Sequence, residues 1–398
     1  FTYSIKGATN TKINSVFGRN PQKTDSFAIK FHLEAHHRLS DFISSKEIDA
    51  IYIATPHSEH FFYALEAIKN GKHVLCEKPL TMNSYESMVL LDLANSKKVF
   101  LMEAFMYRSH PQTRNILKNL SFLPDAKEKI LIEASFGFKA DVPEVHRLRN
   151  PDLGGGAILD VGCYPLTMAK LVAGHLQGLS FAEPKSISAT GQIDETGVDL
   201  QSHAHIVFSD SIEAKISCAI NENFSNNLII SSGQYSISAA DPWHCGQFNE
   251  GNSSIHLLNQ GVSSQEIKCI DNEGLFTREI EHASACILEQ RIESDLISHT
   301  ETQSNMFWLD MWRQEMKINC PKSRINNSPI LQSQAYLFQE TQLKSTDLPG
   351  LNKMGSRLAM GCDNQISDLH AYTMFDHFYG SGGRIFDTAF IYNHGMGD

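Results

Sequence analysis

The chain has 398 residues, which is enough for two or three domains with sizeable hydrophobic cores. Its formal net charge is −11 and it contains no block of basic residues, which argues against a nucleic acid as partner. It has no run of about 18 apolar residues and no secretory signal pattern, so we expect no membrane span and a cytoplasmic location.

Eight cysteines are scattered along the chain without C-x-x-C spacing, so no disulfide framework is expected. Two histidine pairs, His36-His37 and His203/His205, lack an accompanying set of cysteines or carboxylates. We therefore expect no metal site.

Residues 1–107 alternate between strand and helix patterns, which predicts an α/β fold with a doubly wound parallel sheet. The predicted strands are Ile13–Phe17, Ile48–Ala54, His73–Cys76 and Val99–Ala104, and the predicted helices are Asp25–Phe31, Leu39–Ser44, a stretch from His57, and Asn83–Lys97 with a cap at its first or second residue.

The stretch Ile51–Leu80 is the most informative part of the chain. Its first strand stops at Thr55-Pro56, and a helix and a second short strand follow. That second strand delivers Lys78, between a carboxylate and a proline, to the sheet edge where open parallel sheets bind ligands. Lys78 is therefore a catalytic candidate; the alternative is a solvated loop lysine.

The pattern IATP…H…GKHVLCEKP in this stretch resembles the glucose-fructose oxidoreductase / inositol dehydrogenase / rhizopine-catabolism (Gfo/Idh/MocA) family of NAD(P)-dependent oxidoreductases. The resemblance covers roughly residues 11–321. Its dimeric dihydrodiol dehydrogenase branch is the most similar, through Leu101–Pro111 and Gly154–Leu166. It implies a Rossmann-like dinucleotide domain over 1–107, a substrate and oligomerisation domain over 108–320, and a homo-oligomer, dimer or tetramer.

The resemblance also implies three catalytic residues. Lys78 would polarise the substrate oxygen, and Tyr164 would be the general acid/base, its pKa lowered by the Lys78 ammonium. Asp160 would orient Lys78 or the substrate hydroxyls. It lies four residues before Tyr164 on a predicted helix, Gly155–Leu171, hence on the same face. The alternative is a buried tyrosine and an acid favoured by the helix dipole.

Arg19 follows the first predicted strand, and the segment Gly18-Arg19-Asn20 contains no acid. An acid at this strand end binds the ribose of NAD, whereas an arginine accommodates the 2′-phosphate of NADP. We therefore expect NADP, with NAD as the alternative cofactor. The alternative for Arg19 is a surface residue of a loop without a role in binding.

Further residues match family positions close to the cofactor. They are Thr55, Pro56, His57, His60, Glu77 and Arg147. A lone histidine is more often structural, which weakens the case for His57 and His60. Glu103, Arg108 and Arg147 stay open between a site and a scaffold role.

From Ile130 on, the pattern favours an α+β domain with a mainly antiparallel sheet. The predicted strands are Ile130–Phe138, Ser186–Thr190, His203–Phe208, Glu213–Ile220, Asn227–Ser231 and Gln234–Ser238, and two helical stretches follow, about Glu281–His299 and Thr302–Lys317.

Both ends of the sequence look cut. A dinucleotide fold opens with a strand and a Gly-rich turn, but here Gly7 fits the end of a first helix, so the first strand is expected to be missing. Residues 321–350 read as a linker or a wrapping segment. Residues 351–398 resemble the opening of an aldo-keto reductase (β/α)₈ barrel, with Asp387 and Tyr392 matching its catalytic aspartate and tyrosine. Such a barrel needs on the order of 200 residues.

The leading hypothesis is an NADP-dependent oxidoreductase that moves a hydride between nicotinamide and a secondary alcohol or ketone of a sugar, cyclitol or trans-dihydrodiol. One alternative is a bifunctional protein whose main activity belongs to the carboxyl-terminal aldo-keto reductase. The other is a non-catalytic fusion that only binds a dinucleotide.

Overall fold

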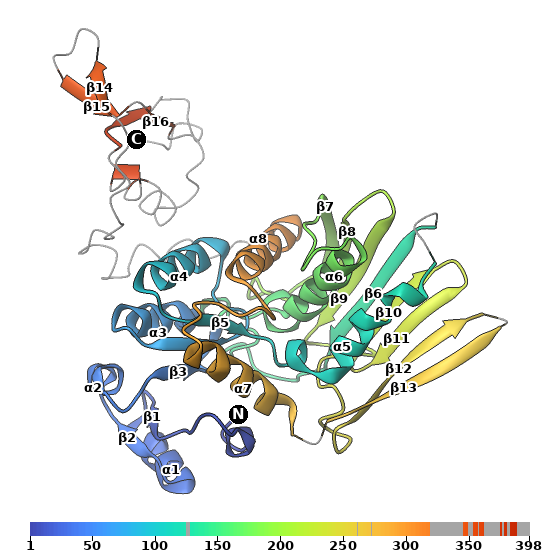
Figure 1. The fold of residues 1–398 in the computed structure, drawn as a ribbon, viewed down its shortest axis with the longest axis horizontal. Helices are drawn as coiled ribbons and strands as arrows, with labels where there is room; N and C mark the ends of the chain where they lie inside the picture. Colours follow the sequence, from blue (N-terminus) through green and yellow to red (C-terminus); the bar gives the residue numbers. More distant parts are fainter. Residues whose placement is uncertain are drawn as a thin grey trace. The chain divides into compact units, whose positions relative to one another are not determined.

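The computed structural model describes residues 1–124, 128–260, 262–271 and 273–318, and beyond these residues 345–348, 353–356, 358–361, 375, 378–379 and 383–387 (Figure 1). The chain divides into two compact units, residues 1–319 and residues 320–398. Each unit is described by itself.

The first third of the chain contains five parallel strands in two separate sheets, one with the order β1-β2 and one with the order β3-β4-β5. The strands are β1 Ser15–Phe17, β2 Glu34–His36, β3 Ala50–Ile53, β4 His73–Glu77 and β5 Leu101–Ala104. The parallel pairing confirms the sequence prediction. Strand β2 was not predicted, because its three residues, Glu-Ala-His, carry no apolar alternation. The missing first strand stays a prediction.

Four helices connect these strands: α1 Pro21–Phe31, α2 Leu39–Ser44, α3 His57–Lys69 and α4 Ser84–Lys97, with a short 3₁₀ helix, Ser4–Gly7, before them. Helix α1 begins four residues before its predicted start, because the Asn20 side chain accepts a hydrogen bond from the Lys23 N–H and Pro21 takes the first helical position. Helix α4 begins as predicted, with Asn83 as its cap.

The second part of this unit is built on an eight-stranded sheet of order β13-β12-β11-β10-β6-β9-β8-β7. Every neighbouring pair is antiparallel except β6 and β9, which are parallel. The strands are β6 Ile130–Gly137, β7 Ser186–Ile193, β8 Asp199–Val207, β9 Ile212–Ala219, β10 Asn227–Ser232, β11 Tyr235–Ala240, β12 Asn252–Asn259 and β13 Ser263–Ile270. The mainly antiparallel sheet was predicted; β12 and β13 were not.

The helices of this part are α5 Pro111–Lys118, α6 Cys163–Leu176, α7 Leu275–Leu288 and α8 His299–Glu315, with short 3₁₀ helices η2 Met106–Ser109, η3 Leu120–Phe122 and η4 Pro151–Leu153. Helix α6 packs on β6 and β9, and α8 contacts both α4 and α6 (Figure 1). The predicted helix over 281–299 was wrong in extent, because the chain leaves the helix after Leu288 and turns back.

The predicted helix over 155–171 is also corrected. It starts with a π-helical turn, η5 Ile158–Gly162, before α6 continues. Within the described residues, the stretch Pro151–Leu176 has the length and composition of a membrane span, but its most apolar window is entirely buried inside the protein. Its helical part, η5 and α6, packs against the large sheet.

The second unit contains two described strand pairs. Strand β14, Ser345–Leu348, pairs antiparallel with β15, Lys353–Ser356, and β16, Ala359–Gly361, pairs parallel with β17, Ile385–Asp387. Strand β14 lies inside the predicted linker. It was not predicted as a strand because its partner, β15, lies beyond residue 350, and the local sequence does not reveal that pairing. The barrel assignment stays a prediction.

Candidate active site

Lys78 lies directly after β4, in a corner that the surrounding core holds in place. The Lys78–Pro79 peptide bond is cis. The Leu80 N–H donates a hydrogen bond of 2.9 Å to the buried Glu103 carboxylate, and burial raises the pKa of Glu103 to about 7. Glu103 therefore belongs to the scaffold of the corner.

The buried carboxylate of Asp160 collects positively charged and polar partners. Its Oδ1 lies 2.9 Å from Arg147 Nη1 and 3.7 Å from Lys78 Nζ, and Lys78 also donates to the main-chain oxygen of Asp160. Burial alone would raise the pKa of Asp160, but the charges of Lys78 and Arg147 outweigh it and lower the pKa below its usual value. Asp160 is thus an ionised anchor for both cations.

His57 approaches the same carboxylate oxygen, with Nε2 3.8 Å from Oδ1. Its Nδ1 lies 2.9 Å from the Gly154 carbonyl, which can only accept, so the ring proton belongs on Nδ1. Burial, and then the nearby Lys78, lower the pKa of His57 to about 3. His57 is therefore a neutral ring whose unprotonated nitrogen faces the Asp160 and Lys78 pair.

His60 has a different role. Its two ring nitrogens lie 2.8 Å from the Pro79 carbonyl and 3.0 Å from the Thr55 carbonyl. It thus connects the ends of β3 and β4, and burial lowers its pKa. We assign His60 to the scaffold of the site, which is the structural reading of a lone histidine.

Tyr164 is buried within a cluster of aromatic rings, those of Phe105, Tyr107, Phe136 and Trp243. Lys78 Nζ lies 5.1 Å from the centroid of the Tyr164 ring, so the ammonium faces the ring and not the hydroxyl. The hydroxyl donates to Met106 Sδ at 3.5 Å.

The pKa of Tyr164 was wrongly expected to be lowered. Burial, and then the negative charge of Glu77, raise it well above its usual value of 10. Tyr164 therefore stays protonated at physiological pH.

Lys78 is the common neighbour of Asp160 and Tyr164. The spacing of four was expected to place these two side chains on one face of an α-helix; Asp160 lies in the π-helical turn and Tyr164 in α6, and both lie beside Lys78. Asp160 also contacts Arg147 and His57, whereas the Tyr164 ring packs in the aromatic cluster. Lys78 thus contacts two residues of one helical segment, the carboxylate of Asp160 and the ring face of Tyr164.

Most of the residues predicted to hold the cofactor follow the carboxyl ends of β1 and β3, whereas Glu77 ends β4 and Arg147 precedes η4. Arg19 follows β1, is largely exposed, and lies 3.3 Å from Glu59 on α3. Pro56 caps α3, whose first turn offers free backbone N–H groups. Within the described part of the chain, the buried hydroxyls of Thr55 and Ser58 have no hydrogen-bond partner. Unpaired buried donors at this strand end fit a dinucleotide.

Ser58 was missed by sequence reasoning; its place in the first turn after the TP pair was the available signal. Glu77 accepts a hydrogen bond from the Tyr52 hydroxyl. The two residues predicted to match an aldo-keto reductase are Asp387, which ends β17 and is exposed, and Tyr392, which lies outside the described residues.

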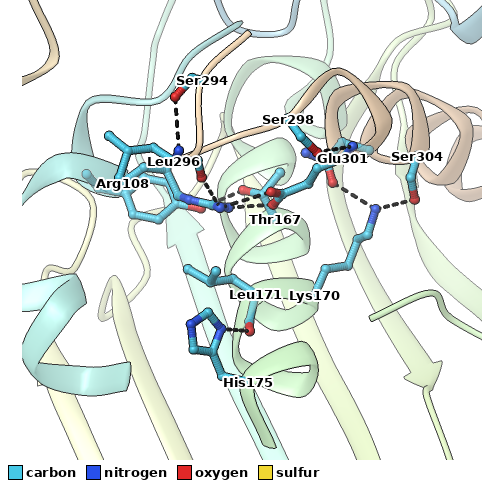
Figure 2. A network of polar contacts seen from close by, with 12 residues as sticks. Arg108, Thr167, Lys170, Leu171, His175, Ser294, Leu296, Ser298, Glu301 and Ser304 are labelled. Atoms are coloured by element: carbon cyan, nitrogen blue, oxygen red, sulfur yellow. Dashed lines mark hydrogen bonds and ion pairs between the residues drawn. The ribbon is translucent and has the colours of Figure 1, made fainter. Parts of the chain in front are cut away.

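Arg108 is not part of this cluster. Its guanidinium forms two bonds to the Glu301 carboxylate, at 2.6 Å and 3.0 Å, and a third to the Leu296 carbonyl (Figure 2). Lys170, close by, donates to Ser304 on α8, and burial lowers its pKa to about 8. Both cations tie α8 to the elements around the site.

Comparison with known proteins identifies the class. The family model described as "Oxidoreductase family, NAD-binding Rossmann fold" matches residues 3–105, and "GFO/IDH/MocA C-terminal domain" matches residues 128–237. The protein is an NAD(P)-dependent oxidoreductase acting on CH–OH groups. The two matched regions together span more than half of the chain, and the chain belongs to the GFO/IDH/MocA family.

Several relatives have assigned activities. Trans-1,2-dihydrobenzene-1,2-diol dehydrogenase of Xenopus tropicalis is 28% identical over 318 residues, which is 79% of this chain and 92% of that protein. D-xylose 1-dehydrogenase (NADP(+)) of Hypocrea jecorina is 34% identical over 176 residues, 42% of this chain and 45% of that protein.

Among solved structures, KijD10, a 3-ketoreductase from Actinomadura kijaniata in complex with TDP-benzene and NADP, is 20% identical with a TM-score of 0.68. The alignment covers 79% of this chain and 92% of that one. At this identity the likeness shows the fold alone. It extends across both the parallel strands and the large sheet.

Proposed function

We propose that this protein is an NADP-dependent oxidoreductase that transfers a hydride between nicotinamide and the secondary alcohol or ketone carbon of a sugar, a cyclitol or a trans-dihydrodiol. The observation that carries the proposal is the position of the Lys78 ammonium, between the Asp160 carboxylate and the face of the Tyr164 ring. A cation fixed at the end of a parallel strand, beside a phenol, is suited to a carbonyl or carbinol oxygen.

Each residue has a defined part. Lys78 donates a hydrogen bond to the substrate oxygen and stabilises the negative charge that develops there. Tyr164, which is protonated at physiological pH, gives a proton to that oxygen in the reduction direction. Asp160 keeps Lys78 in position and balances its charge together with that of Arg147. The bound cofactor supplies the hydride.

The preference for NADP is supported by Arg19 and by the names of relatives. Arg19 lies after β1 in a segment without a carboxylate, which suits a 2′-phosphate better than a free ribose. The xylose dehydrogenase relative is named for NADP(+) and the ketoreductase structure contains NADP. The substrate class rests on the dihydrodiol and sugar activities of the relatives. A homo-oligomer and a cytoplasmic location stay predictions.

The test is single-turnover hydride transfer, followed by NADPH and NADH fluorescence, across sugar, cyclitol and dihydrodiol substrates. Lys78→Ala and Tyr164→Phe should each slow hydride transfer by about 100-fold or more, because each removes a group acting on the reacting oxygen. NADPH binding should change only a few-fold, and NADPH should be preferred to NADH.

Tyr235→Phe, on β11 of the large sheet, is the matched control and should keep the wild-type rate. Wild-type hydride transfer in both Lys78→Ala and Tyr164→Phe would reject the assignment. NADPH binding without turnover on any substrate of the panel would favour the non-catalytic alternative.

A further inference from the structure

A second cluster of reactive side chains lies at the end of α7, outside the catalytic site. It consists of His282 and Cys286 on α7 and Asp295 in the segment that follows. The ligand atoms of these three residues all lie within 4.8 Å of one another. The spacing of four between His282 and Cys286 puts both on one face of the helix. Since the chain turns back after Leu288, Asp295 reaches that same face.

We propose that His282, Cys286 and Asp295 form a binding site for one Zn²⁺ ion. Thiolate, imidazole and carboxylate are ligands that zinc accepts together, and a tetrahedral ion with three protein ligands takes water in the fourth position. Nothing in the proposed oxidoreductase chemistry uses these residues, so the zinc site stands independently of that function.

The distances between the ligand atoms fit this geometry. Zinc bonds of about 2.0–2.1 Å to nitrogen or oxygen and about 2.3 Å to sulfur, at tetrahedral angles, separate N from S by about 3.6 Å and N from O by about 3.4 Å. His282 Nε2 lies 3.5 Å from Cys286 Sγ and 3.4 Å from Asp295 Oδ1. Two edges of the coordination tetrahedron are thus already in place.

The surroundings of the cluster support a metal ion. Arg291 Nη2 lies 2.9 Å from Asp295 Oδ1 and holds that carboxylate in position, as partners of metal-bound carboxylates do. The Ser294 hydroxyl lies 2.8 Å from His282 Nε2 and gives up this hydrogen bond when that nitrogen binds the ion. The Cys286 side chain is buried, whereas the Asp295 side chain is exposed and leaves a path for the ion.

The site would fasten a segment that attaches to the dinucleotide domain. The Ile292 carbonyl accepts a hydrogen bond from the Leu101 N–H of β5, and the Ser294 hydroxyl accepts one from Leu296 N–H, whose carbonyl binds Arg108 (Figure 2). A zinc ion bound by Asp295, His282 and Cys286 would therefore link this segment to α7. Because the ion would bind the folded chain and not the unfolded chain, it should raise the thermal stability of the protein.

The experiment titrates the full chain, freed of metal with a chelator, with Zn²⁺ against a chromophoric competitor and with Co²⁺ in an absorption spectrum. We expect one Zn²⁺ per chain, a thiolate-to-cobalt charge-transfer band, and a melting temperature raised by a few degrees. His282→Ala and Cys286→Ser should each weaken Zn²⁺ binding by at least about 100-fold, and Cys286→Ser should abolish the band.

Two matched variants serve as controls. His175→Ala, on α6, and Cys269→Ser, on β13, should keep the wild-type affinity and the band. Asp295→Asn changes an exposed side chain, so it keeps the test valid even if Cys286→Ser fails to fold, and it should weaken binding by about 10-fold or more. The proposal is overturned if Zn²⁺ does not bind, or if binding is unchanged in Asp295→Asn and His282→Ala.

Discussion

Asp160 is the residue on which the charges of the catalytic site depend. It is buried, and its carboxylate lies close to Lys78 and Arg147 and to the neutral ring of His57. Without this carboxylate, two cations would repel each other at one strand end. Lys78 and Asp160 could be selected from the sequence motif. That Arg147 is the cation nearest to Asp160 could be learned only from the folded structure.

Asp160→Asn should destabilise the protein by about 1–3 kcal/mol at pH 7, because it leaves two cations without their buried partner. The folded-state pKa of Asp160 is lowered below the usual value of 3.8, so its contribution to stability is present above that pH. The contribution is lost as the pH falls through the folded-state pKa.

Urea unfolding at pH 7 and near pH 3 provides the measurement. The difference between wild type and Asp160→Asn should shrink at the lower pH. Asp210→Asn, at a fully exposed carboxylate beside Lys185, should show no comparable difference at either pH. Equal stability of wild type and Asp160→Asn at pH 7 would contradict the role given to Asp160.

At the scale of elements, the sequence located most helices and strands of residues 1–240 but misjudged those that depend on distant partners. Strand β12 has buried Ile255 and Leu257 alternating with polar residues, a signal that was present and overlooked. The π-helical turn had no local signal. It is stabilised by Asp199 of β8, whose Oδ2 accepts a hydrogen bond of 2.6 Å from the Ile158 N–H.

Gly156 is the position that makes this turn possible. Its φ is +109°, and an added Cβ would lie 2.3 Å from Asp199 Oδ1. Gly156→Ala should therefore displace Asp199, cost at least about 2 kcal/mol, and slow hydride transfer because the turn carrying Asp160 shifts.

Gly178→Ala is the matched control, since Gly178 has a φ of +73° but open space around its Cβ position. It should cost only about 1 kcal/mol, for the backbone alone. Chemical denaturation of both variants compares the two costs. Equal costs would show that the contact with Asp199 is unimportant.

At the scale of the whole unit of residues 1–319, helix α8 is joined to the segment that follows β5 through a buried ion pair as well as through the core. Arg108, in η2 after β5, reaches Glu301 on α8, and both side chains are almost fully buried. The sequence left Arg108 open between site and scaffold. The choice depended on a partner 193 residues away, which no local pattern reveals.

Removing one member of this pair should be costly. Glu301→Gln leaves the Arg108 charge buried without its counter-charge, so we expect a loss of about 3–5 kcal/mol in the free energy of unfolding. Replacing both, as Arg108→Met with Glu301→Leu, should cost less than Glu301→Gln alone, because no uncompensated charge remains.

Denaturant unfolding of the single and double variants measures these changes in the free energy of unfolding. Lys185→Ala, which removes an exposed ion pair with Asp210, should change stability by less than about 0.5 kcal/mol. A Glu301→Gln protein as stable as wild type would contradict the proposed role of the pair in joining these elements.

The sequence by itself determined the parallel α/β start of the chain, the mainly antiparallel sheet that follows, and the candidate lysine at the end of β4. These features come from local periodicity and from a long motif, both of which a single chain displays directly. Tertiary structure alone decided the raised pKa of Tyr164, the π-helical turn at Asp160, and the approach of Asp295 to His282 and Cys286. Each of these depends on burial or on a chain reversal, and such effects arise only when distant segments pack together.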